Sequence, residues 1–374
     1  MNDGVAAKPL VTEANAGAEA PSPIRALLSR NRTFLMGVAI LLIVICHAEF
    51  RIPIWRVMYP VMTIKRLTYG GVDLFFFLSG FGVCASLDRS PDAAAFYGRR
   101  LKRIYPAYLP IAALWVISVL LRGPMQANAV FGVLTGLGYW MQLPNQFMWY
   151  VSAILVFYAI TPYLHAALRR AKNLHVAFAL LMAGSLLIAL PAFYTWQIMA
   201  ASRLPVYIAG IYVYAATERR GKAAWLWEGI AYALMVVGFY LIINMPNWVS
   251  DGAMYYHGLF NYPFLLIAPG FCMLLARRAD LLRRCFLRFF ARFCESMGRC
   301  SLELCLIHFL VFETARAYFE LNNWTRLGLA VLSILLSIPY AALVRRVTAR
   351  CGEKRGKSAA QREENASLDA AREG

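Results

Sequence analysis

Two histidines and one aspartate interrupt long apolar stretches of this chain. His47 ends the stretch GVAILLIVICH, Asp73 lies near the start of GGVDLFFFLSGFG, and His308 ends SLELCLIH. An ionisable group inside a bilayer is costly, so each is a candidate for function. A histidine exchanges a proton near neutral pH, so His47 could act as a general base. The structural alternative is a histidine bonded to a nearby carbonyl, and an aspartate that caps a helix N-terminus.

A basic segment, YGRRLKRIYPAYLP, precedes the third apolar stretch. Arg100 and Arg103 are three residues apart, so on a helix they share one face and could hold a polyphosphate together. The alternative is anchoring at the cytoplasmic membrane surface, where Lys and Arg accumulate. Farther along, Trp149 begins WYVSAILVFYAITP and Arg203 stands in SRLPVYIAGIY. Trp149 fits either a belt at the membrane surface or a pocket wall.

Several other kinds of site are not indicated. The chain holds no Gly-rich phosphate loop of the Walker type, no G-x-S-x-G and no H-E-x-x-H. Its eight cysteines include no C-x-x-C pair. We therefore expect free thiols and no metal site.

The elements that must position these residues are membrane helices. Hydrophobic residues make up 60% of the 374 positions and charged residues 16%, whereas soluble domains have about 45–50% and 25%. The apolar residues form blocks long enough to cross a hydrocarbon core about 30 Å thick. We predict an all-α polytopic bundle of about ten spans, at residues 34–54, 70–88, 104–121, 147–167, 173–190, 203–217, 224–244, 258–276, 300–319 and 326–346.

Charge predicts the orientation and the domain boundaries. The net charge is +18, and 30 of the 38 Lys and Arg residues fall in segments that are cytoplasmic if both termini are inside. The positive-inside rule explains this basic excess better than nucleic-acid binding does. Residues 1–30 and 351–374 are polar and predict disordered tails around one membrane domain at 31–350.

Five segments, in this order, resemble the bacterial membrane acyltransferases of acyltransferase family 3. They are residues 37–47, 70–81, 99–109, 149–162 and 301–308, and the likeness spans roughly residues 33–346. Three positions depart from the pattern of many members. Met36 stands at a position that is often arginine, and Ile154 and Leu155 stand at positions that are often glutamate. These departures suggest a sub-branch of the family.

The resemblance implies an activity and roles for particular residues. Members move an acyl group, often acetyl from acetyl-CoA, to a hydroxyl of an extracytoplasmic glycan. His47 is then the catalytic histidine, Asp73 falls in the motif of the second span, and Arg100 and Arg103 are the paired arginines that would bind the CoA phosphates. As a hypothesis, Asp73 holds the His47 imidazole if the first two spans pack with these groups in reach. The further pocket candidates are Ser79, Trp149, Arg203 and His308.

The sequence therefore predicts a multi-pass O-acyltransferase of the inner membrane. Its co-substrate is acetyl-CoA or another acyl-CoA, and its acceptor is a glycan or a lipid-linked sugar. We expect the protein to contact the lipid bilayer and to bind neither nucleic acid nor a metal. Direct transfer and an acyl-histidine intermediate both stay open. The rival functions are a secondary transporter or flippase of envelope precursors, and a catalytically silent scaffold.

Overall fold

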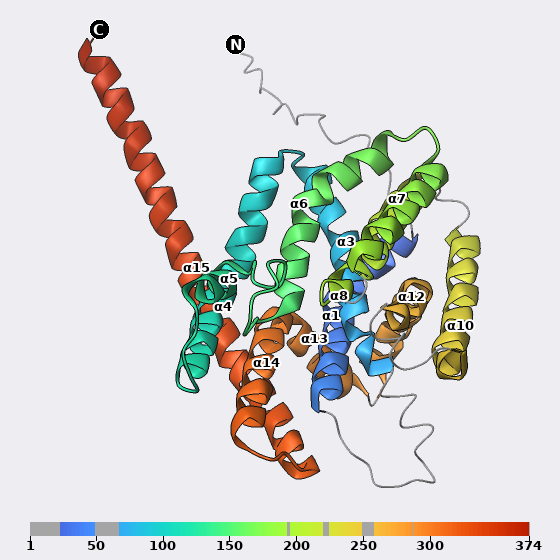
Figure 1. Ribbon diagram of the computed structural model, residues 1–374. Coiled ribbons are helices and arrows are strands. Elements are labelled where there is room, and N and C mark those ends of the chain that lie inside the picture. Colours follow the sequence, from blue (N-terminus) through green and yellow to red (C-terminus); the bar gives the residue numbers. More distant parts are fainter. Residues whose placement is uncertain are drawn as a thin grey trace, which may run out of the picture.

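The computed structural model describes residues 23–48, 67–192, 195–219, 224–248, 258–285 and 287–373. Within these ranges it consists of helices and contains no strand (Figure 1). In chain order the helices are α1 (Pro23–Ala48), α3 (Gly71–Arg89), α4 (Ala93–Leu120), α5 (Ala127–Thr135), α6 (Trp149–Arg170), α7 (Leu174–Ala189), α8 (Ile198–Ala201), α9 (Leu204–Arg219), α10 (Ala224–Trp248), α12 (Pro263–Arg284), α13 (Arg288–Arg299), α14 (Ser301–Tyr318) and α15 (Asn323–Glu373), with 3-10 turns at Leu190–Ala192 and Leu259–Asn261.

Each of the ten predicted spans overlaps a helix, and residues 49–54 of the first span lie outside the described residues. Within the described ranges, nine helices are long and apolar enough to cross a membrane by length and composition. The remaining predicted span is α14, whose 18 residues include Glu303, Glu313 and Arg316. The prediction of an all-α polytopic bundle is confirmed, and the protein is a multi-pass membrane protein.

The ends of the chain differ from the prediction. Residues 23–30 belong to α1 rather than to a disordered tail, and residues 1–22 lie outside the described residues. At the other end, α15 continues as a helix to Glu373 and projects from the bundle (Figure 1). We expected disorder from residue 351 because the sequence there is polar. That segment is also rich in Ala, Glu, Lys and Arg, which are strong helix formers.

The most enclosed helices, α3 and α9, pack against each other through glycines. In the most apolar 18-residue stretch of the spans that contain α3 and α9, 83% of the residues are buried inside the protein. The corresponding share in the span that contains α7 is 17%, so α3 and α9 form the centre of the bundle. Gly80 of α3 faces the backbone of Tyr207, and Gly210 of α9 faces the backbone of Phe77. Residues without side chains let two helix backbones approach closely in a membrane.

A polar cluster joins four helices around the Asp88 carboxylate. Asp88 of α3 lies 3.0 Å from His165 and 3.4 Å from Arg169, both on α6. Tyr214 of α9 donates to the same carboxylate at 2.8 Å, and Arg25 of α1 donates to Tyr214. Such a network fixes the relative positions of the helices that supply it, here α1, α3, α6 and α9.

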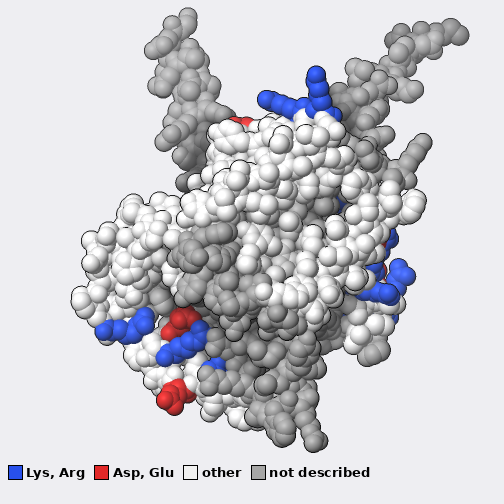
Figure 2. Space-filling model, turned by 45° about the vertical axis from the view of Figure 1, so that its right-hand side comes forward, with Lys and Arg blue, Asp and Glu red and all other residues white. Residues whose placement is uncertain are grey.

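The outer helices present apolar side chains to their surroundings. Large exposed hydrophobic residues occur on α4, α7, α10 and α15. Figure 2 shows a broad face with few charged side chains, which gather in a few clusters. Soluble proteins rarely expose such an area, whereas the lipid chains of a bilayer cover it without exposing it to water.

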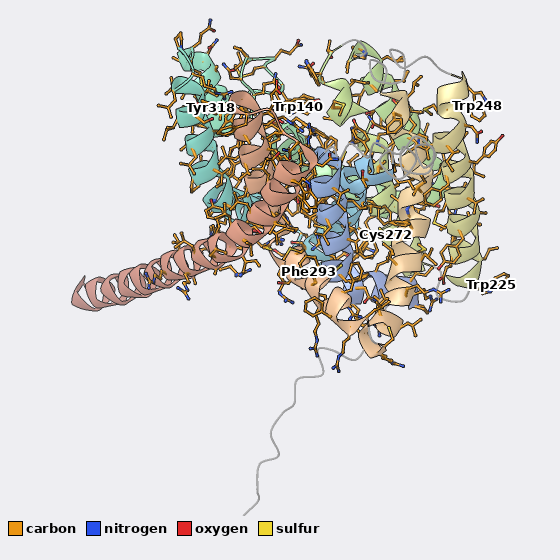
Figure 3. The ribbon with its side chains drawn as sticks, turned by 90° about the horizontal axis from the view of Figure 1, so that it is seen from below. Trp140, Trp225, Trp248, Cys272, Phe293 and Tyr318 are labelled. Atoms are coloured by element: carbon orange, nitrogen blue, oxygen red, sulfur yellow. The ribbon has the colours of Figure 1, made fainter. Side chains whose placement is uncertain are left out.

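The bundle has two ends that differ in their residues. Figure 3 shows Phe293 of α13 and Trp225 at one end, and Trp140, Trp248 and Tyr318 at the other. We name these the α13 end and the Trp140 end. Because α14 begins directly after α13 and finishes at Tyr318, it runs from the α13 end to the Trp140 end. Trp and Tyr at both ends are typical of membrane–water interfaces.

The packing of α3 on α9 predicts the effect of one added methyl group. A Cβ at Gly210 would clash with the Phe77 carbonyl oxygen. We expect Gly210→Ala to lower the free energy of unfolding by about 1–3 kcal/mol, as overpacking does. The control is Gly184→Ala on α7, where a Cβ meets nothing within 4 Å. Thermal unfolding in detergent measures both, and an equal stability of the two variants would contradict this packing.

Candidate active site

His47 and His308 meet inside the bundle. Their rings lie edge to face, with centroids 4.8 Å apart. His308 is fully buried, and His47, one residue before the end of α1, is half-buried. The sequence marks both residues as candidates, but nothing in it indicates that they touch.

Each imidazole is bonded through Nδ1 to a carbonyl one turn earlier in its own helix. His47 Nδ1 lies 3.0 Å from the Ile43 carbonyl oxygen, and His308 Nδ1 lies 3.0 Å from the Leu304 carbonyl oxygen. A carbonyl oxygen only accepts, so Nδ1 carries the proton in both rings and Nε2 is the basic nitrogen. Nε2 of His308 is buried and has no hydrogen-bond partner in the part of the chain that the structure describes. Two proton acceptors therefore lie side by side.

Two arginines hold the end of α1 that carries His47. Arg316 of α14 donates to the His47 carbonyl oxygen at 2.9 Å, and Arg326 of α15 donates to the Ala48 carbonyl oxygen at 3.2 Å. Arg316 also pairs with Glu313. Cations at a helix C-terminus satisfy its last carbonyls and its negative dipole end. The position of His47 thus depends on α14 and α15, which no local sequence signal indicates.

Asp73 pairs with Arg203 rather than with a histidine. Asp73 Oδ1 lies 3.4 Å from Arg203 Nε, and both side chains are fully buried. Among the described residues, neither carboxylate oxygen has a hydrogen-bond partner, so Asp73 makes no bond to the His47 imidazole. This corrects the expectation that Asp73 orients His47. A buried guanidinium requires a counter-charge, and Asp73 supplies it.

Arg203 is enclosed by aromatic rings. Its guanidinium carbon lies 5.0 Å from the centre of the Tyr69 ring and 5.1 Å from that of Trp149. Its Nη1 donates to the Met199 carbonyl oxygen at 2.8 Å. These are cation–π distances, so the charge holds both rings in place. Asp73, Trp149 and Arg203, three of the candidates, therefore form one cluster.

Three arginines line a second feature, which we name the arginine cavity. The Arg100 guanidinium lies over the rings of Phe96 and Tyr158, at 5.1 and 5.5 Å, and its Nε is buried without a partner. No described residue of the lining is acidic, so the cavity suits an anion. The lining consists of Arg32, Met36, Phe75, Ser79, Arg100, Arg103, Ile104, Tyr150, Ile154, Tyr158, Ser301, Leu302 and Cys305.

Arg32 is the cavity residue that the sequence analysis missed. It lies one helical turn before Met36, so the two share a helix face, and both line the cavity. Ile154 lines it as well. Met36 and Ile154 are two of the positions where the chain departs from the pattern of many family members. Arg32 thus supplies a positive charge from α1, and no described residue of the lining supplies a carboxylate. The spacing of four residues between Arg32 and Met36 is the sequence signal that places both on one helix face.

Helix α14 connects the arginine cavity to the histidine pair. Cys305 lines the cavity, and His308 follows three residues later, a rise of about 4.5 Å. The cavity wall formed by α14 thus comes within one turn of His308, whereas Arg32, which lines the cavity from α1, lies 15 residues before His47.

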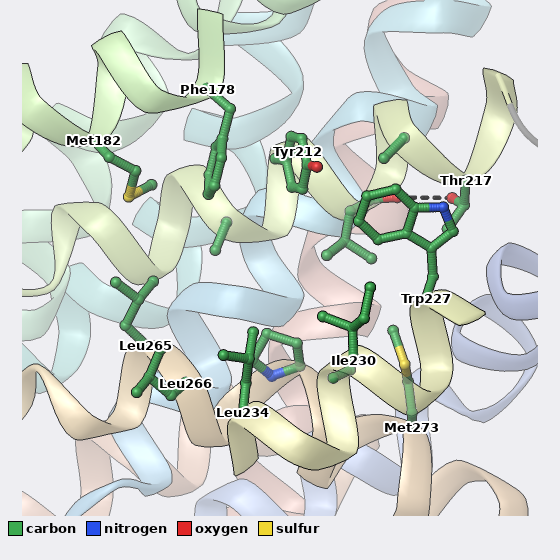
Figure 4. Close-up of a pocket in the computed structure, with 15 residues that line it drawn as sticks. Phe178, Met182, Tyr212, Thr217, Trp227, Ile230, Leu234, Leu265, Leu266 and Met273 are labelled. Atoms are coloured by element: carbon green, nitrogen blue, oxygen red, sulfur yellow. Dashed lines mark hydrogen bonds between the residues drawn. The ribbon is translucent and has the colours of Figure 1, made fainter. Parts of the chain in front are cut away.

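A separate pocket between α7, α9, α10 and α12 offers little chemistry. Its volume is about 220 Å³, and its lining is almost wholly apolar, including Phe178, Met182 and Trp227 (Figure 4). The hydroxyl of Thr217 donates within its own helix, to the Val213 carbonyl oxygen at 2.7 Å. We assign no catalytic part to this pocket.

The fold and the site define a multi-pass membrane protein in which two histidines are in contact, one of them a helical turn from a cavity lined by three arginines. The family model described as the acyltransferase domain matches residues 34–346. The chain therefore belongs to this acyltransferase family, as the five sequence segments predicted.

One relative matches part of the chain. Nodulation protein 10 of Rhizobium leguminosarum bv. viciae is 27% identical over 150 residues, which is 34% of this chain and 38% of that protein. The match thus covers well under half of the relative. No solved structure matches the chain.

The contact between the histidines predicts that they act as a unit. We expect His47→Ala to lower the acyl-transfer rate about 10²–10⁴-fold, which is typical of losing a general base. We expect the double variant His47→Ala, His308→Ala to lose less than the product of the two single losses, because residues of one unit are not additive. Transfer rates in membranes at matched expression measure this. If the loss of rate in the double variant equals the product of the two single losses, the two rings act independently.

Proposed function

We propose that this protein is an O-acyltransferase that moves an acyl group, most simply acetyl, from acyl-CoA to a hydroxyl of an envelope glycan or lipid-linked sugar. The observation that carries the proposal is the position of the histidine pair beside the arginine cavity. The first offers a basic nitrogen, and the second offers a site for a polyphosphate. Family membership favours acyl transfer over a transporter function.

The charges that line the arginine cavity support binding of the CoA phosphates there. Arg32, Arg100 and Arg103 approach it from α1 and α4, so three guanidinium groups from two helices could hold one polyanion. Guanidinium binds phosphate oxygens through paired hydrogen bonds. The unpartnered Nε of Arg100 supports this interpretation, because a buried donor without an acceptor is costly.

His47 would remove the proton that hampers attack by an alcohol. Its Nε2 accepts the hydroxyl proton while the acceptor oxygen attacks the thioester carbonyl carbon. A carbon–oxygen bond forms, the carbon–sulfur bond breaks, and the proton passes from the imidazolium to the CoA thiolate. The alternative, in which Nε2 itself takes the acyl group first, uses the same nitrogen.

We propose an inner-membrane location with both termini in the cytoplasm. The bias of Lys and Arg toward the predicted inside segments supports this orientation. The arginine cavity then lies in the cytoplasmic half, where acyl-CoA is available. His47, 15 residues after Arg32 on α1, lies about 22 Å farther along the helix. The acyl group would therefore reach the outer half of the bilayer, where an extracytoplasmic hydroxyl can meet it.

Removing one arginine should weaken donor binding. We expect Arg32→Gln and Arg103→Ala each to raise the KM for acetyl-CoA about 10- to 100-fold, because each removes a charged hydrogen-bond donor. Lys102→Gln is the matched control, since Lys102 is exposed on the same helix and does not line the cavity. Unchanged KM values for both arginine variants would place the CoA phosphates elsewhere.

The acceptor should carry an acetyl ester that depends on His47. Mass spectrometry of envelope glycans and lipids compares cells with the gene, cells without it, and cells with His47→Ala. We expect the acetyl ester only in the first, because base catalysis is required for transfer to a hydroxyl. The same acetyl ester in cells without the gene would refute the proposal.

A further inference from the structure

A cavity on the Trp140 side of the histidine pair has no role in donor binding. Its volume is about 470 Å³, within the range of about 300–1,000 Å³ that is usual for ligand sites. Tyr139, Trp149 and Trp196 bring aromatic rings to it, and Phe309 and Glu313 of α14 complete one wall. We name it the aromatic cavity.

The aromatic cavity and the arginine cavity lie along the same helix, on opposite sides of His308. Ser301 and Cys305, toward the α13 end of α14, line the arginine cavity. Phe309 and Glu313, toward the Trp140 end, line the aromatic cavity. His308 falls between the two sets. A group bound in the aromatic cavity therefore approaches the histidines from the side opposite the arginines.

The polar groups of the aromatic cavity suit an uncharged ligand rich in hydroxyls. Asn145, Gln146 and Glu313 line it, and no described residue of its lining is Lys or Arg. Amides donate and accept hydrogen bonds, and a carboxylate accepts them, so these groups match hydroxyls and do not match phosphates. Aromatic rings cover the apolar faces that remain.

The loop that carries much of this lining is held in an unusual backbone conformation. Gln142, Asn145 and Met148 have φ values of 53°, 54° and 48°, a region that non-glycine residues rarely adopt and that often marks functional sites. Trp115 of α4 donates to the Asn145 carbonyl oxygen at 3.0 Å, and Gln197 donates to the Tyr139 carbonyl oxygen at 3.2 Å. These bonds hold the cavity in a preformed shape.

The Asp73–Arg203 pair supports the wall of this cavity from behind. Trp149 lines the cavity and also stacks on the Arg203 guanidinium. Met199 likewise lines it, and its carbonyl oxygen accepts from Arg203. The buried charge thus fixes the position of a ring that a ligand would touch.

We propose that the aromatic cavity is the acceptor site and that it binds one sugar ring, with a hydroxyl directed at His47 and His308. This rests on the proposed acyl transfer. The sugar oxygen would form the new bond to the acyl carbon, the thioester carbon–sulfur bond would break, and the proton would leave through imidazole Nε2. Cavity position, lining and preformed shape support the same assignment.

A panel of methyl pyranosides tests the site on the full-length protein in neutral lipid nanodiscs. Binding is measured by calorimetry without acetyl-CoA, and transfer is measured with acetyl-labelled CoA. We expect Trp196→Ala to weaken binding and raise the KM for the pyranoside about tenfold, as loss of an aromatic contact does. Trp225→Ala is the matched control, since both indoles are 75% exposed and only Trp196 lines the cavity. Gln146→Ala should act in the same direction.

The outcomes separate the site from the reaction. Pyranoside binding that Trp196→Ala weakens and Trp225→Ala leaves unchanged supports the sugar site. Such binding without any transfer by the wild-type protein keeps the sugar site and refutes the proposed acyl transfer. If no pyranoside binds, or if Trp196→Ala and Trp225→Ala behave alike, the sugar site is refuted, even where acetyl-CoA is consumed.

Discussion

The bilayer offers no hydrogen-bond partner to a polar group, and this constraint governs where the functional side chains of this protein lie. His47 and His308 each bond through Nδ1 to a carbonyl of their own helix, which fixes the tautomer of both rings. The last carbonyls of α1 are satisfied by Arg316 and Arg326. The need to satisfy polar groups within the bundle thus sets both the tautomer of the histidines and the position of the end of α1.

The Asp73–Arg203 pair shows that the same constraint also shapes residues with a structural part. Both side chains are fully buried, and two aromatic rings cover the guanidinium. Breaking such a pair leaves an uncompensated charge in a medium of low dielectric constant, which is strongly destabilising. The Arg203 guanidinium lies over the Trp149 ring, which lines the aromatic cavity, so the pair acts on that cavity through the position of the ring.

The two cavities divide the bundle around the histidine pair. Arg32, Arg100 and Arg103 line one cavity, which we propose for the donor phosphates. Aromatic rings, two amides and a carboxylate line the other, which we propose for the acceptor. In the proposed reaction the two substrates approach the histidine pair from opposite sides.

The sequence by itself determined the helical class, the positions of the ten spans and the shared face of Arg100 and Arg103. These depend on the length of apolar blocks and on helical spacing, which are local properties of the chain. Only the tertiary structure decided that His47 meets His308, that Asp73 serves Arg203, and that Arg32 joins the arginine cavity. Contacts between helices depend on how each helix is rotated and packed, and for α3 and α9 that packing is set by the close approach of Gly80 and Gly210.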